Sequence, residues 1–61
     1  MKPPLPDQIT CVERELGMRR RVYPRWVATG RMTQADADRE IATMSAVLDT
    51  LRSINQPGLA L

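Results

Sequence analysis

The sequence predicts an all-α protein: an antiparallel two-helix hairpin with a kinked first helix, assembling as a homo-oligomeric helical bundle whose simplest form is a dimer. Apolar residues recur at spacings of three and four in two separate segments, which is the period of an α-helix. A glycine and a helix-capping sequence lie between these segments. A chain of 61 residues is also too small to bury both apolar stripes by itself.

Residues 1–6 are expected to form a flexible, proline-rich arm. Three of these six residues are proline, which lacks a backbone donor and disfavours a helix. Asp7 follows directly and has the side chain of a good N-cap. The helical hairpin domain is therefore predicted over residues 7–55.

The first helix is predicted from Gln8 onward. Its packing seam consists of residues spaced alternately by three and four: Ile9, Val12, Leu16, Arg19, Tyr23 and Trp26. Pro24 removes one helical hydrogen bond and clashes with the preceding turn, so we expect a kink or a break near residues 20–23. Gly30 supplies a stop signal, because it tolerates a positive φ.

The second helix is predicted to begin with a capping box, in which Thr33 caps and Asp36 reaches back. Its apolar stripe has spacings of four, three, four and three: Ala37, Ile41, Met44, Leu48 and Leu51. Side chains one turn apart can form ion pairs, which predicts Asp36 with Arg39 and Asp49 with Arg52. Residues 56–61 form the C-terminal tail, which either frays or docks on a neighbour.

Self-association is the expected source of additional stability. A core of this size rarely supplies more than about 3–5 kcal/mol. With one cysteine and no histidine in the chain, an intrachain disulfide is impossible and a zinc site lacks its usual ligands. Two hairpins packed as a four-helix bundle would cover the remaining apolar side chains.

The charge is unevenly distributed along the chain. Residues 1–31 contain seven basic and three acidic residues, a net charge of +4, whereas residues 32–61 contain two basic and four acidic residues, a net charge of −2. Eight of the nine basic residues are arginine, whose planar side chain suits bidentate and stacked contacts. The first half of the chain is therefore expected to face an anion.

Arg19 occupies a seam position where an apolar residue is expected. A buried, unpaired guanidinium is costly, so Arg19 needs a carboxylate, a ligand or solvent. Glu15 lies one turn earlier and can form a structural salt bridge. Alternatively, Arg19 lines a polar pocket at a dimer seam, or a kink turns it outward.

Four of the nine basic residues and the only two aromatic residues lie within residues 18–27. Arg21 and Arg25 share a second stripe with Arg14, and this stripe is either a solvated basic face or an anion-binding face. Tyr23 and Trp26 are either core residues or a surface on which bases stack. The candidate ligand-binding residues are Arg19, Arg20, Arg21, Tyr23, Arg25 and Trp26, with Arg31 adding to the positive rim.

The sequence gives little evidence of a catalytic site. It has no histidine, no serine or cysteine nucleophile with a candidate base, and no phosphate-binding glycine loop. We therefore expect no enzymatic activity, no catalytic residue, no metal site and no cofactor. No apolar run approaches the roughly 20 residues that span a bilayer, and the N-terminus lacks the apolar stretch of a secretory signal. The expected location is the cytoplasm.

Most of the chain, roughly residues 9–52, resembles a group of small proteins encoded by phages and prophages, for which no activity is established. The most specific part is the sequence VYPRWV at residues 22–27. The resemblance extends to further segments: residues 12–16, 18–21 and 30–34, with Ala37-Asp38 and Glu40-Ile41. It implies a small protein made in the cytoplasm of an infected bacterium, and it implies no catalytic residues.

Three functions follow as hypotheses. The first is a non-enzymatic binding protein that sequesters an anionic, nucleotide-like ligand, such as an immune second messenger, as an anti-defence sponge. The second is a nucleic-acid-binding accessory protein whose arginine stripe contacts phosphates. The third is an inhibitor that binds a host protein through the first helix.

Overall fold

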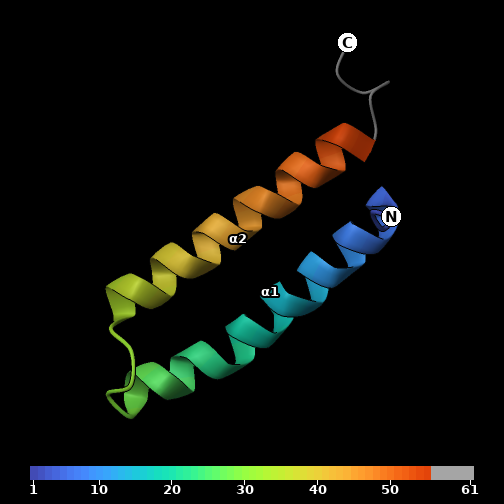
Figure 1. Ribbon diagram of the computed structural model, residues 1–61. Coiled ribbons are helices and arrows are strands. Elements are labelled where there is room, and N and C mark those ends of the chain that lie inside the picture. The colour runs from blue at the N-terminus through green and yellow to red at the C-terminus, as the bar shows by residue number, and fades with distance from the viewer. Residues whose placement is uncertain (56–61) are drawn as a thin grey trace.

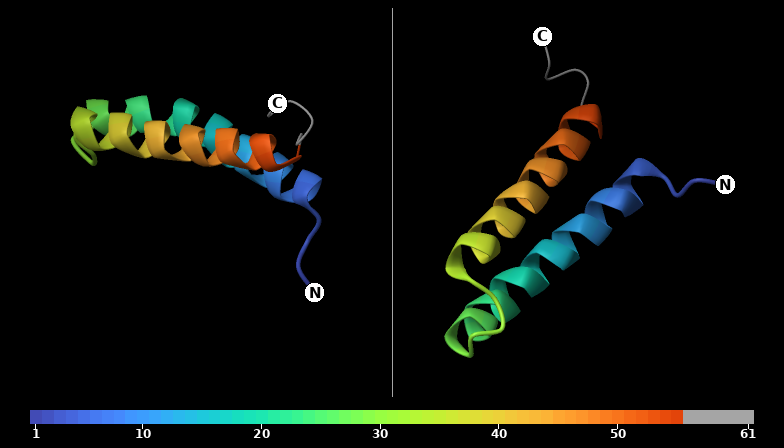
Figure 2. Two further views of the ribbon diagram at one scale, coloured as in Figure 1. Left: turned by 90° about the horizontal axis from the view of Figure 1, so that it is seen from above. Right: turned by 60° about the vertical axis from the view of Figure 1, so that its left-hand side comes forward.

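The computed structural model describes residues 1–55, which form two long helices packed side by side. Helix α1 spans Leu5–Ala28 and helix α2 spans Gln34–Asn55. They run antiparallel and are joined by a short turn, so the N-terminus and the end of α2 lie at the same, open end of the hairpin (Figures 1 and 2). Within residues 1–55 there is no strand. The predicted helical hairpin is confirmed.

Helix α1 begins at Leu5, three residues before the predicted start at Gln8. Pro4 is its N-cap, with φ −64° and ψ 155°, and the Pro4 carbonyl accepts hydrogen bonds from the amides of Asp7 (3.0 Å) and Gln8 (3.2 Å). The prediction that Asp7 caps the helix is therefore wrong, and Leu5 and Pro6 belong to the helix instead of the arm. Proline is tolerated there because the first-turn amides have no acceptor within the helix.

Helix α1 continues through Pro24 to Ala28, so of the two predicted alternatives near residues 20–23, a kink or a break, the break is wrong. The ribbon of α1 curves gradually along its length in both figures (Figures 1 and 2). Pro24 is exposed, whereas its neighbour Tyr23 is buried in the seam. Packing against α2 on this side thus holds the helix together across the one missing backbone bond.

The turn between the helices has a defined hydrogen-bonding pattern. Gly30 has a φ of +78°, as predicted from its role as a stop signal. Its amide donates to the Val27 carbonyl at 3.1 Å, and the Arg31 amide donates to the Trp26 carbonyl at 2.9 Å. These two bonds are those of a Schellman motif, and they place Arg31 back over the last turn of α1.

The predicted N-cap of α2 at Thr33 is confirmed, whereas the prediction that Asp36 reaches back to complete the capping box is wrong. The Thr33 hydroxyl accepts a hydrogen bond from the Asp36 amide at 3.0 Å, and the Thr33 carbonyl accepts from the Ala37 amide at 3.0 Å. The carboxylate of Asp36 does not complete the capping box, because it pairs with Arg39. The ion pair between Asp36 and Arg39 was predicted.

The predicted pair between Asp49 and Arg52 is wrong. Arg52 instead reaches across the hairpin, and its Nη2 lies 2.7 Å from Glu13 Oε2 on α1. Both side chains are about half exposed, at 51% and 45%, so this pair contributes at most about 1 kcal/mol. The spacing of residues along one helix could not predict a partner on the other helix.

The core between the helices is small. Only four apolar side chains of the described residues are buried: Leu16, Tyr23, Ala37 and Leu48. Val47 and Ile54 remain 41% and 59% exposed on α2. The hairpin therefore leaves part of its apolar surface uncovered.

Candidate arginine and aromatic site

The six predicted ligand-binding residues point in three directions from α1. Arg19, Tyr23 and Trp26 lie on the side that faces α2. Arg21 and Arg25 lie on the opposite, outer side, since each helical residue advances by about 100°. The remaining residue, Arg20, lies two turns after Glu13 on one flank of the hairpin. A single chain therefore does not bring all six side chains to one site.

Arg19 is held between the two helices. Its Nε donates to Glu15 Oε1 at 3.1 Å, as predicted, and its Nη1 donates to the backbone carbonyl of Glu40 at 3.3 Å. The carboxylate of Glu40 lies 3.9 Å from the same nitrogen. Only 18% of the Arg19 side chain is exposed. The geometry thus supports the structural reading, in which Arg19 links α1 to α2.

The two aromatic rings form a continuous series of contacts with two arginines. The Arg19 guanidinium lies 5.9 Å from the Tyr23 ring centre, and the Tyr23 and Trp26 rings stack with centres 5.5 Å apart and planes at 30°. The Arg31 guanidinium lies 5.6 Å from the Trp26 ring centre. Contacts of this kind contribute roughly 0.5–1 kcal/mol each. We call these four side chains the arginine–aromatic ladder.

The ladder limits what the rings can do for a ligand. Tyr23 is 8% exposed, so its ring is a core element and does not offer a free face to a base. Trp26 is only half buried, and Arg31 covers it from the turn. The sequence placed Arg31 on a positive rim but did not reveal its contact with Trp26, which depends on the Schellman turn.

Three of the arginines that make no ion pair within residues 1–55 lie on the outer side of α1. Arg19, Arg39 and Arg52 each pair with a carboxylate. Among residues 1–55, five other arginines make no such pair: Arg14, Arg20, Arg21, Arg25 and Arg31. Three of them, Arg14, Arg21 and Arg25, follow one another at spacings of seven and four and form an exposed stripe along α1. We call these three residues the arginine stripe.

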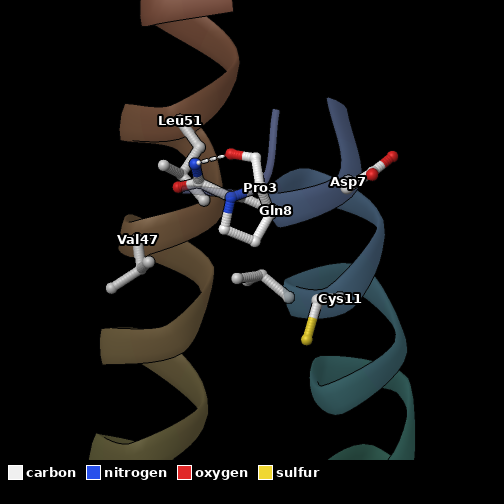
Figure 3. Close-up of a pocket in the computed structure, with 7 residues that line it drawn as sticks. Pro3, Asp7, Gln8, Cys11, Val47 and Leu51 are labelled. Atoms are coloured by element: carbon white, nitrogen blue, oxygen red, sulfur yellow. Dashed lines mark hydrogen bonds between the residues drawn. The ribbon is translucent and has the colours of Figure 1, made fainter. Parts of the chain in front are cut away.

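Two surface depressions lie on the hairpin, and one of them adjoins the arginine stripe. The first has a volume of about 390 Å³ and is lined by Cys11, Arg14, Glu15, Met18 and Arg21. The second has a volume of about 440 Å³ and lies at the open end of the hairpin, between Cys11 on α1 and Val47 and Leu51 on α2 (Figure 3). It is mostly apolar, and the sequence reasoning missed it because it needs residues from both helices.

Metal ligands do not gather in the described part of the chain, where no three histidine, cysteine, aspartate or glutamate residues could hold an ion together. Neither α1 nor α2 combines the length and the apolar character that crossing a bilayer requires. Comparison with known protein families, with curated proteins and with solved structures finds no match to this chain.

Proposed function

We propose that this chain is a non-enzymatic binding protein, made in the cytoplasm of a phage-infected bacterium, that forms a homo-oligomer and sequesters an anionic, nucleotide-like ligand. The observation that carries the proposal is the set of five arginines on and just after α1 that pair with no carboxylate of residues 1–55. An exposed guanidinium without a carboxylate is free to bind a phosphate with two parallel hydrogen bonds. Such a protein would act as an anti-defence sponge, releasing its ligand unchanged.

The candidate residues take different roles in this proposal. Arg20, Arg21 and Arg25 contact the phosphates, because they are exposed. Trp26 and Arg31 form the rim of the site at the closed end of the hairpin. Arg19 and Tyr23 act as positioning residues, since their contacts with Glu15, Glu40 and Trp26 fix the ladder.

A paired set of variants tests this assignment. Replacing Arg21 and Arg25 by glutamine removes two free guanidinium groups, and we expect nucleotide affinity to fall at least about 100-fold, because each charge-assisted contact contributes roughly 1.5–3 kcal/mol. The measurement is isothermal calorimetry with cyclic and linear nucleotides. The control is K2Q/R39Q, which removes the same charge from exposed positions outside the site. Wild-type protein that binds none of the nucleotides contradicts the proposal, as does an equal loss in both variants.

The arginine stripe favours a nucleic acid as the second candidate ligand. Its three guanidinium groups are exposed along one side of α1, where they can follow a phosphate backbone instead of closing around one small molecule. Phosphate contacts of this kind release counterions, so affinity falls by about 0.7–0.9 log units per contact for each log unit of salt.

Three contacts therefore predict a slope of about −2 to −3 in a plot of log affinity against log salt concentration. Fluorescence anisotropy with labelled single-stranded and duplex DNA measures this slope. Replacing Arg14 by glutamine should lower the slope by nearly one unit, whereas R39Q should leave it unchanged. Absence of binding at low salt rules out this candidate.

A further inference from the structure

The two sides of the hairpin differ in their chemistry. One side carries the ion pair between Glu13 and Arg52, with Arg20 two turns further along α1. The other side carries apolar side chains of both helices, which we call the apolar face: Cys11, Met18, Val22, Val47, Leu51 and Ile54. Cys11, Val47 and Leu51 line one depression, and Met18 lines the next one together with Cys11 and the charged side chains of Arg14, Glu15 and Arg21. Val22 and Ile54 continue the same rows at spacings of four and seven.

The apolar face leaves two large apolar side chains of α2 exposed. Val47 and Ile54 are 41% and 59% exposed, and the depression of about 440 Å³ beside Val47 has a mostly apolar lining (Figure 3). A stable protein–protein interface covers about 800 Å² of each partner. That is about one-sixth of the 4740 Å² surface of this chain, so one side of an elongated hairpin is large enough.

Charge complementarity selects a second copy of this chain as the occupant, and also selects its orientation. Helix α1 contains five arginines and three carboxylates, a net charge of +2, and α2 contains two arginines and four carboxylates, a net charge of −2. Two hairpins can meet face to face in two symmetric ways. A two-fold axis perpendicular to the helices places α1 over α1 and α2 over α2, so that like charges face each other. An axis parallel to the helices places each α1 over the partner's α2, so that unlike charges face each other.

We infer that a second copy of this chain packs on the apolar face about a two-fold axis parallel to the helices, with α1 over the partner's α2. Every neighbouring pair of helices in the resulting four-helix bundle is then antiparallel. A rotation about this axis does not shift residues along the helix direction. Cys11 of one chain therefore lies at the same level as Val47 and Leu51 of the partner.

This arrangement has a consequence for the proposed ligand. The axis brings the two hairpin turns to the same end of the bundle, so Trp26 and Arg31 of both chains lie at that end. This end of the dimer then carries the candidate arginines of two chains, whereas one chain alone does not direct its arginines to a single site. The interface itself rests on apolar burial and charge, and it stands independently of the proposed nucleotide binding.

Analytical ultracentrifugation tests whether the apolar face forms the dimer interface. Wild-type protein should sediment as a dimer, and replacing Val47 by glutamate should weaken dimerisation at least about tenfold, because a carboxylate without a partner would be buried. The matched control is A46E, which adds the same charge to the adjacent exposed residue on the side of α2 that points away from α1. Monomeric wild-type protein, or a V47E dimer as tight as wild type, overturns the inference.

Electron paramagnetic resonance distances test the orientation, and they do so without relying on the folding of V47E. A nitroxide at position 35, in the C11A/A35C variant, marks the closed end of the hairpin. Neighbouring helices in a bundle are about 8–10 Å apart, so we expect a label separation of about 25 Å or less. Turns at opposite ends would separate the labels by at least roughly 33 Å, the length of the 22-residue α2, and that result overturns the proposed axis.

The two proposals fail separately. A dimer with the expected distance that binds no nucleotide preserves the interface and contradicts the proposed function. A monomer that binds nucleotides preserves the proposed nucleotide binding and contradicts the interface, together with the homo-oligomer that the proposed function includes.

Discussion

Replacing Tyr23 by alanine should largely unfold this protein at room temperature. Tyr23 is 8% exposed and is the largest of the four buried side chains. It also contacts Arg19 on one side and Trp26 on the other. Truncating a buried aromatic residue to alanine costs roughly 3–5 kcal/mol, which is comparable to the stability that a core of this size supplies. Circular dichroism during thermal and urea denaturation measures the loss.

The control for this variant is Tyr23→Phe, which keeps the ring and removes the hydroxyl. No buried polar side-chain atom of the described residues lacks a hydrogen-bond partner, and no described residue bonds to the Tyr23 hydroxyl, so Y23F should fold as stably as wild type. A Y23A variant that keeps wild-type stability but loses nucleotide affinity would contradict the core role and make Tyr23 a ligand contact.

Replacing Pro24 by alanine should stabilise the hairpin by about 2 kcal/mol. A proline inside a helix costs about 3 kcal/mol relative to alanine. Part of that gain is lost, since alanine gives the unfolded chain more conformational freedom, an effect of about 0.4–1 kcal/mol. Pro24 is exposed and α1 is continuous on both sides of it, so the new amide can donate to the Arg20 carbonyl without repacking.

Urea denaturation measures this effect as a higher midpoint with an unchanged slope, and the melting temperature should rise by roughly 10 °C in a domain of this size. Arg25→Ala is the matched control, because it is adjacent, exposed and expected to be nearly neutral. A P24A variant less stable than wild type would show that the curvature of α1 around Pro24 supports an interface.

Several features of the fold followed from local sequence signals. The stop at Gly30, the cap at Thr33 and the pair between Arg19 and Glu15 all depend on residues within one or two turns of each other. The start of α1 was misplaced because Asp7 is a better cap by residue type than Pro4, yet first-turn prolines cost little. The expected break at Pro24 failed for a different reason, since packing against α2 outweighs one lost backbone bond.

The candidate site was also predictable from the sequence only in part. Its residue types were predictable, because arginines and aromatic residues are concentrated in residues 18–27. Their separation into an inward group and an outward group follows from helical geometry. The sequence could not show that Glu40 completes the environment of Arg19 or that Arg31 covers Trp26, since both contacts require α2 or the turn to be in place.

The sequence by itself determined the two helices, their turn and the uneven charge between the halves, because helical period, capping and charge are local or compositional properties. Only the tertiary structure decided which arginines of residues 1–55 make ion pairs between the helices. Arg52 pairs with Glu13 and Arg19 with Glu40 across the hairpin, while Arg21 and Arg25 face away from α2. The physical reason is that ion pairs between helices depend on which flanks meet, and spacing along one helix does not encode that.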